Sequence, residues 1–211
     1  MSFAGPKHTR AIPCTTALQS IALSRKGDCM SAEKHRLGWI GTGRMGYALC
    51  ERLLKAGHDL WVYNRTRSKA EPLEELGAKV VDSPADLAER DVVFMMVAGP
   101  KDVMQVTIGE NGVLSKDQRP PILVDSTTID PATSAELRAA AAELGTEVIA
   151  APVSGNAKVV KSGKLTVVAS GPESAYATVE PYLEVFGRKV TYVGGVDEAR
   201  LVKLCHNLHL G

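Results

Sequence analysis

Short apolar runs alternate with longer amphipathic segments from Leu37 to about Val193. The run Val92–Val97 has six consecutive apolar residues, which is typical of a strand covered on both faces. The segment Met45–Ala56 instead has apolar residues at helical spacing, and Gly57 follows it as a C-terminal stop. Strands that alternate with helices of this length predict βαβ units, and so a doubly wound, mostly parallel sheet of the α/β class.

The remaining elements follow from the same pattern. The predicted strands are Leu37–Gly41, Leu60–Tyr63, Lys79–Val81, Val92–Val97, Ile122–Asp125, Val148–Pro152, Leu165–Ala169 and Lys189–Val193. The predicted helices are Met45–Ala56, Ser68–Leu76, Ser83–Arg90, Lys101–Ile108, Pro131–Leu144 and Glu173–Phe186. We expect all of these strands to belong to one array.

The first 29 residues differ from the rest of the chain. They are basic and rich in Ser and Thr, with no acid until Asp28. This composition fits an organellar transit peptide. The alternative is an upstream extension read from the wrong start, because Met30 stands just before the first strand. No strong amphipathic period runs through the segment, so we favour the extension. Under either reading, residues 1–34 are predicted to be disordered. The protein is predicted to be cytoplasmic, with the mitochondrial matrix as the alternative.

Composition limits the remaining classes of function. Apolar residues make up 45% of the chain, charged residues 23%, and the net charge is +1, which gives no electrostatic reason to expect nucleic acid or a membrane surface. No apolar run approaches the ~20 residues that span a bilayer. The four cysteines have no C-x-x-C spacing, which indicates a reducing compartment. His206 and His209 have no third ligand in sight, so no metal site is predicted.

A glycine turn follows the first predicted strand. The hexamer Gly41-Thr42-Gly43-Arg44-Met45-Gly46 matches G-x-G-x-x-G and lies between a strand and a helix. The first glycine permits the tight turn, the second lets the backbone approach a pyrophosphate, and the third lets helix and strand pack closely. The helix N-terminus offers unpaired N–H groups to phosphates. The alternative is a tight turn without a ligand, but the context favours a dinucleotide-binding Rossmann-type sheet.

The second strand ends in Asn64-Arg65-Thr66, where an NAD-binding site would place an acid. A carboxylate there would bind the ribose 2′-hydroxyl and repel a 2′-phosphate. The donors and positive charge of these residues instead favour NADP as the cofactor, with NAD as the alternative.

Five segments together resemble the β-hydroxyacid dehydrogenases, which include 3-hydroxyisobutyrate dehydrogenase, tartronate semialdehyde reductase and glyoxylate reductase, and more distantly 6-phosphogluconate dehydrogenase. The segments are G-T-G-R-M-G from Gly41, V-D-S-T-T-I-D-P from Val124, A-P-V-S-G-N from Ala151, S-G-K-L-T-V-V-A-S-G from Ser162 and V-K-L-C-H-N from Val202. They fall in family order over about Leu37–Gly211.

The resemblance implies roles for individual residues. Lys203 matches the family's general acid/base, and Asn207, one helical turn on, matches the asparagine that holds the substrate. Ser154, Gly155 and Asn156 align with the S-G-G loop that binds a substrate carboxylate, although Asn156 replaces the second glycine. Cofactor contacts are also implied at three further positions, which are Val97, Ala98 and Thr128.

The resemblance also implies a domain plan. Residues 35–193 form the NAD(P)-binding domain, and residues 194–211 begin the helix that leads to an all-helical C-terminal domain, which is missing here. A glycine-rich run usually precedes the lysine, whereas Gly195 is followed here by Val196-Asp197-Glu198-Ala199. The chain therefore resembles a fragment that binds cofactor and turns over little substrate.

Three functions stay open from the sequence. The first is NADP-dependent hydride transfer on a small 3-hydroxyacid or its semialdehyde, with a homo-oligomer expected for the full-length protein. The second is an imine-reductase-like enzyme, against which Lys203 argues, because those enzymes commonly lack this lysine. The third is a non-catalytic NADP-binding module.

Overall fold

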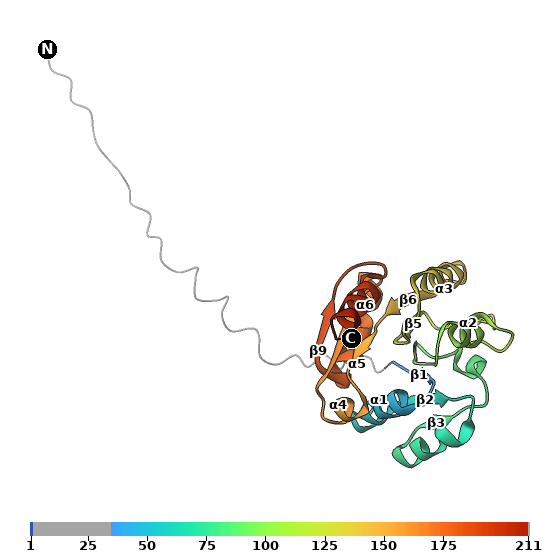
Figure 1. The fold of residues 1–211 in the computed structure, drawn as a ribbon. Helices are drawn as coiled ribbons and strands as arrows, with labels where there is room; N and C mark the ends of the chain where they lie inside the picture. The colour runs from blue at the N-terminus through green and yellow to red at the C-terminus, as the bar shows by residue number, and fades with distance from the viewer. Residues whose placement is uncertain (2–34, 211) are drawn as a thin grey trace. The chain divides into compact units, whose positions relative to one another are not determined.

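Six parallel strands form the central sheet of the part of the chain that the structure, a computed structural model, describes (Met1 and residues 35–210; Figure 1). The strands are β1 (Leu37–Ile40), β2 (Leu60–Tyr63), β3 (Lys79–Val80), β4 (Val92–Met95), β5 (Ile122–Asp125) and β6 (Glu147–Ala150). Their order is β3-β2-β1-β4-β5-β6, so the chain reverses its direction of winding between β1 and β4. The predicted doubly wound parallel sheet is confirmed. The predicted disordered extension lies outside the described residues, apart from Met1.

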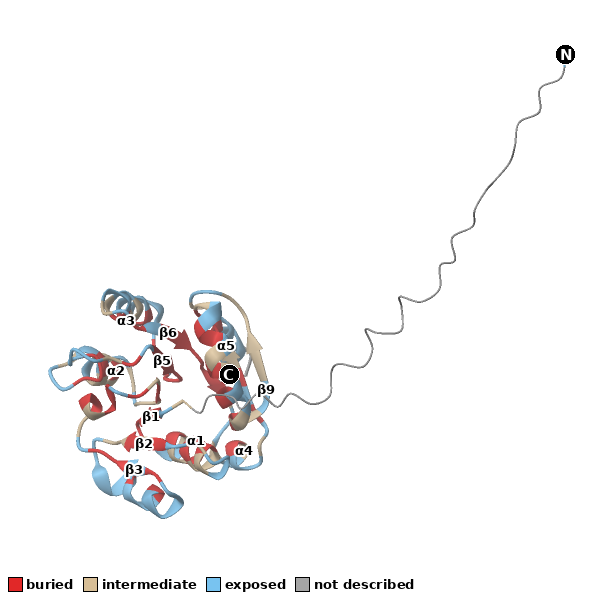
Figure 2. Ribbon diagram, turned by 180° about the vertical axis from the view of Figure 1, so that it is seen from behind, coloured by how far each residue is buried: buried red, intermediate tan, exposed pale blue. Residues whose placement is uncertain are grey.

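Helices cover both faces of this sheet. The α-helices are α1 (Arg44–Lys55), α2 (Pro100–Ile108), α3 (Pro131–Glu143), α4 (Ala157–Lys161), α5 (Glu173–Phe186) and α6 (Glu198–Leu210). One core lies between the sheet and helices α1 and α5, and a second lies between the sheet and helices α2 and α3. Figure 2 shows buried residues in red along the central strands and exposed residues in pale blue on the outer side of α3.

Alternate residues of each central strand enter opposite cores. In β4, Phe94 belongs to the core under α1 and α5, whereas Val93 and Met95 belong to the core under α2 and α3. Trp39 of β1 stacks on Phe94 with ring centroids 5.7 Å apart. Because both faces are covered, β4 is a continuous apolar run, as the sequence predicted.

The expectation of one continuous array was wrong for the last strands. β8 (Leu165–Ala169) and β9 (Gly187–Tyr192) form a separate sheet with a short strand, β7 (Val153–Ser154), in the order β7-β8-β9. β7 is antiparallel to β8, and β8 is parallel to β9. The physical reason is visible in the burial of β8, where Thr166 is exposed between buried neighbours, whereas β4 and β5 are buried throughout.

Two of the predicted helices are 3-10 segments instead. In place of the predicted helix Ser68–Leu76, the structure has two 3-10 helices, Arg67–Lys69 and Glu71–Leu76, which meet at Ala70. Pro72 lacks the N–H that an α-helix needs there, so the turn tightens. The segment after Ser83 is a single 3-10 helix, Pro84–Leu87. Within the described residues, no helix has the length and apolar character that crossing a membrane requires.

Candidate cofactor and active site

The glycine turn between β1 and α1 is shaped by close backbone contacts. Gly41 has a φ of +96°, and a Cβ placed on it would lie 2.3 Å from the carbonyl oxygen of Met96. A Cβ on Gly46 would lie 2.0 Å from the carbonyl oxygen of Gly41. Trp39 holds this same oxygen by donating a hydrogen bond from Nε1 over 2.8 Å. Glycine is therefore required at both positions by the fold itself.

Gly43 differs from the other two glycines. A Cβ placed on it would meet no atom within 4 Å, and its φ of −65° is open to any residue. It is the N-cap of α1, it has no side chain to cap the helix, and no acid occupies the first turn. The helix therefore presents unpaired N–H groups and its positive end to the space beside Gly43, which suits a pyrophosphate.

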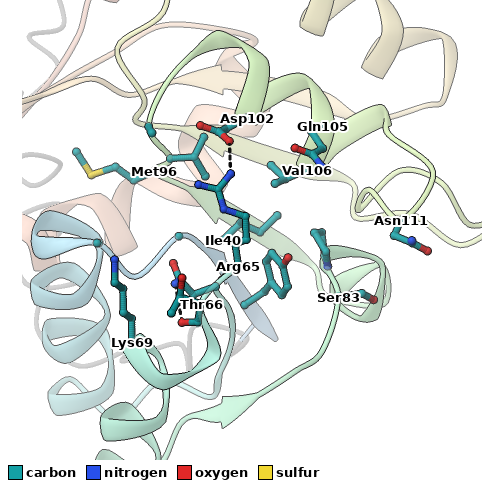
Figure 3. A pocket seen from close by; sticks show the side chains of 18 of the residues that line it. Ile40, Arg65, Thr66, Lys69, Ser83, Met96, Asp102, Gln105, Val106 and Asn111 are labelled. Carbon is teal, nitrogen blue, oxygen red and sulfur yellow. Dashed lines mark hydrogen bonds and ion pairs between the residues drawn. The ribbon is translucent and has the colours of Figure 1, made fainter.

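That space is a cleft of about 700 Å³ at the carboxyl ends of β1, β2 and β4 (Figure 3). The predicted cofactor residues in its lining are Gly41, Gly43, Arg44, Met45, Gly46, Asn64, Arg65, Thr66, Val97 and Ala98. Thr42 and Thr128, the other predicted cofactor residues, do not line it. Thr42 is buried, and its Oγ1 has no hydrogen-bond partner among the described residues, whereas Thr128 is exposed. A cleft at this reversal of the sheet is where such folds bind ligands.

The end of β2 forms one wall of the cleft. Asn64 Oδ1 accepts a hydrogen bond from the Thr42 N–H over 2.9 Å, and Asn64 Nδ2 donates to the Thr66 carbonyl over 2.8 Å. Asn64 thus joins the β2 turn to the glycine turn. The Arg65 side chain is 77% exposed and reaches the opposite wall, where NH1 lies 3.0 Å from Asp102 Oδ1 of α2. Lys69 also lines the cleft, and no pattern in the sequence pointed to it.

The residues predicted for catalysis and substrate binding lie outside this cleft lining. Lys203 of α6 is partly buried, and desolvation lowers the pKa of its ammonium group. Asn207 is exposed one turn further along α6. Ser154 lies in β7, which pairs with β8, and α6 contacts the same strand. The structure therefore places Ser154 and α6 next to one shared strand.

The loop after β7 is held by glycine and by a helix cap. Gly155 has a φ of +138°, and a Cβ there would lie 2.9 Å from Leu165 Cδ1. Asn156 is the N-cap of α4, and its Oδ1 accepts hydrogen bonds from the N–H groups of Lys158 and Val159. Asn156 stands where a glycine was expected, and its side chain caps α4. The side-chain oxygen Oδ1 is therefore already hydrogen-bonded within the protein.

Comparison with known proteins identifies the family. Residues 36–194 match the family model of the NAD binding domain of 6-phosphogluconate dehydrogenase. The chain belongs to the β-hydroxyacid dehydrogenase family. Within it, the chain corresponds to the N-terminal NAD(P)-binding domain.

Named relatives agree with this assignment. The chain is 36% identical over 212 residues to the "Probable 3-hydroxyisobutyrate dehydrogenase-like 1, mitochondrial" of Arabidopsis thaliana, which covers 96% of this chain and 63% of the relative. The solved structure of Psf3 in complex with NADP+ and 2-OPP is 37% identical, with a TM-score of 0.76, over 82% of this chain and 62% of that one. An imine reductase from Myxococcus stipitatus in complex with NADP+ is 25% identical, with a TM-score of 0.76, over 83% of this chain and 61% of that one.

The chain spans 49% to 63% of the length of eight curated relatives that it matches. Among the described residues of this family member, no group of three or more His, Cys, Asp or Glu side chains could hold a metal ion.

A buried network at the start of α6 was not predicted from the sequence. Arg200, 3% exposed, donates from NH2 to Asp125 Oδ2 over 2.7 Å and from NH1 to the Thr127 carbonyl over 2.8 Å. Its Nε lies 2.9 Å from Ser134 Oγ and 3.1 Å from Asp197 Oδ1. Burial raises the pKa of the Asp125 carboxyl, and the Arg200 guanidinium opposes that rise. Asp197 lies in the stretch Val196–Ala199, where the resemblance suggested a glycine-rich run, and Arg200 follows that stretch directly.

The same network reaches the cofactor cleft. Thr127 Oγ1 accepts a hydrogen bond from the Val97 N–H over 3.1 Å, and Val97 lines the cleft. A continuous set of hydrogen bonds therefore connects Arg200, in the first turn of α6, with the loop after β4. Lys203 lies three residues after Arg200 on the same helix.

Proposed function

We propose that this domain binds NADP in preference to NAD and serves a hydride-transferring oxidoreductase of a small 3-hydroxyacid or its semialdehyde. The observation that carries the proposal is the cleft at the carboxyl ends of β1, β2 and β4, with the glycine turn on one side and Arg65, Thr66 and Lys69 on another. Membership of the family and the name of the Arabidopsis relative support the substrate class.

The residues present fit a nicotinamide dinucleotide. The open side of Gly43 and the uncapped start of α1 suit the pyrophosphate. Arg65, Thr66 and Lys69 offer two positive charges and a hydroxyl to a 2′-phosphate. Val97 and Ala98 line the cleft at the end of β4. When bound, the nicotinamide supplies or accepts a hydride.

Lys203 is the proposed general acid/base. Its Nζ takes the proton of the substrate hydroxyl in oxidation and gives a proton to the carbonyl oxygen in reduction. Partial burial lowers its pKa, which increases the fraction of neutral amine that can accept a proton near neutral pH. Asn207, on the same face of α6, is proposed to hold the substrate beside the lysine.

The loop after β7 is the proposed carboxylate site. Ser154 offers a hydroxyl, and Gly155 and Asn156 offer backbone N–H groups. Because Oδ1 of Asn156 caps α4, we propose that this residue acts through its backbone rather than through its side-chain oxygen. Neither Thr42 nor Thr128 lines the cleft, so Thr42 is kept as a cofactor residue by the glycine motif and Thr128 by the resemblance alone.

A fluorescence titration with NADPH and NADH tests the cofactor proposal. We expect tighter binding of NADPH, and Arg65→Ala should remove most of the difference, costing ~1.5–3 kcal/mol, or about 10- to 150-fold in affinity. Arg67→Ala is the matched control, since Arg67 pairs with Asp82 and Glu71 and does not line the cleft. Equal or tighter NADH binding by the unaltered chain would refute the proposal.

Imine reduction is a competing proposal, favoured by the similarity to the Myxococcus stipitatus imine reductase. A cofactor-binding module without turnover is the other. Assays with a small hydroxyacid, its semialdehyde and a cyclic imine, each with NADP cofactor, separate the three. Turnover of the imine alone supports imine reduction, and cofactor binding without any turnover supports the module.

Location and assembly are proposals as well. The prediction of a cytoplasmic protein stays untested, while the mitochondrial name of the Arabidopsis relative favours the mitochondrial matrix. Imaging of a C-terminally tagged chain in cells would distinguish these locations. A homo-oligomer remains the expectation for the full-length protein.

A further inference from the structure

An ion pair crosses the cofactor cleft between its two walls. Arg65, at the end of β2, extends to Asp102, in the first turn of α2, and NH1 lies 3.0 Å from Oδ1 (Figure 3). Both residues line the cleft. The pair therefore occupies the side of the cleft where the β2 turn would meet the adenosine end of a dinucleotide.

The two partners differ in how firmly they are held. Asp102 is only 28% exposed and lies at a helix N-terminus, where the helix dipole stabilises a carboxylate. Arg65 is 77% exposed on a long side chain. Arg65 is therefore the partner that can move between Asp102 and another anion.

Asp102 supplies a negative charge that the β2 turn lacks. The motif Asn64-Arg65-Thr66 has no acid, which favours a 2′-phosphate, but α2 brings a carboxylate to the same guanidinium. A 2′-phosphate must either displace this carboxylate from Arg65 or bind beside it against like-charge repulsion. NAD has a neutral 2′-hydroxyl there and meets neither cost.

We propose that Asp102 is a specificity-determining residue, which competes with the 2′-phosphate of NADP for Arg65 and so narrows the preference for NADP over NAD. This inference rests on the proposed NADP binding at the same cleft. The residues after β2 account for the preference for NADP over NAD. Asp102 of α2 limits how large that preference becomes.

Titrations of NADPH and NADH with Asp102→Asn test the inference. An exposed pair of this kind contributes little, so we expect NADPH to bind about two- to fivefold more tightly. NADH should bind unchanged or more weakly. Glu110→Gln is the matched control, because it removes an equal charge from another part of the cleft lining, and its effect on NADPH should be smaller. In an Arg65→Ala background, Asp102→Asn should give no gain.

Other results overturn the inference. Unchanged or weaker NADPH binding by Asp102→Asn would mean that Asp102 does not compete with the phosphate, or that it orients Arg65 toward it. An equal gain in the Arg65→Ala background would mean a general charge effect. Asp102→Ser, which keeps a hydrogen-bonding side chain in the first turn of α2, repeats the test if the Asn variant is poorly folded. Unchanged NADPH binding by Arg65→Ala would also overturn the inference, since Asp102 can compete only for a guanidinium that binds the phosphate. Equal or tighter NADH binding by the unaltered chain would refute the proposed function itself.

Discussion

The buried guanidinium of Arg200 lies 2.7 Å from the carboxylate of Asp125, and this ion pair joins the first turn of α6 to the carboxyl end of β5. Their side chains are 3% and 0% exposed. Removing either charge would leave the other buried without an opposite charge to offset its desolvation, so the stability of the protein depends on both being present.

Arg200→Met should therefore destabilise the protein by about 3–5 kcal/mol, since it leaves the Asp125 carboxylate buried and unpaired. Urea unfolding followed by circular dichroism measures this change. Arg188→Met, at an exposed position of β9, is the control and should change stability by about 0.5 kcal/mol or less. Adding Asp125→Asn to Arg200→Met should recover part of the loss, and a further loss instead would contradict the pairing.

The glycine turn predicts opposite outcomes at two of its positions. Gly43→Ala should leave the melting temperature almost unchanged, since the added Cβ meets nothing within 4 Å, but it should weaken NADPH binding about tenfold or more by occupying the phosphate side. Gly46→Ala should destabilise the fold itself, because its Cβ would lie 2.0 Å from a backbone oxygen. Thermal melts with and without NADPH measure both. Normal NADPH affinity in Gly43→Ala would argue against a pyrophosphate at this turn.

The ion pair between Arg36 and Asp91 predicts a dependence of stability on pH. The hydrogen bond from the Arg36 guanidinium holds the pKa of Asp91 below its usual value. Because the folded-state pKa is depressed, the pair stabilises the protein above the unfolded-state value of ~3.9, and this stabilisation is lost as pH falls through the lower folded-state value. Asp91→Asn should therefore be less stable than the unaltered chain at about pH 7, with a smaller difference at about pH 3. A difference that is equal at both pH values would show that Asp91 acts through packing.

Much of the fold could be predicted from the sequence because β1, β4 and β5 are buried on both faces. That burial makes β4 an uninterrupted apolar run, and β5 is apolar up to Asp125. The separate sheet of β7, β8 and β9 could not be predicted, since an apolar run identifies a strand without naming its partners. The short helix α4 was missed for a related reason: its start depends on the cap formed by Asn156, which stands where the resemblance suggested a glycine loop.

In the site, as in the fold, the sequence predicts local features but not contacts between distant residues. The glycine turn is local, so its spacing alone predicted Gly41, Gly43, Arg44, Met45 and Gly46 as residues of the cleft. The ion pairs in the cleft and beside it join residues that are distant in sequence. Asp102 lies 37 residues after Arg65, and Arg200 lies 75 residues after Asp125. No local pattern could have matched these partners, since only the order of the strands brings them together.

Lys203 gives the sharpest test of the proposed chemistry. Lys203→Ala should lower kcat by about 10²–10⁴-fold in a preparation that turns over a small hydroxyacid or semialdehyde, because it removes the proton carrier. NADPH affinity should stay almost unchanged, since Lys203 does not line the cofactor cleft. Lys203→Arg should be similarly inactive, because a guanidinium keeps the charge but cannot release its proton. Lys189→Ala, at an exposed position of β9, is the matched control for losing one positive charge. Near-normal turnover by Lys203→Ala would remove the lysine from the mechanism and place imine reduction ahead of hydroxyacid chemistry.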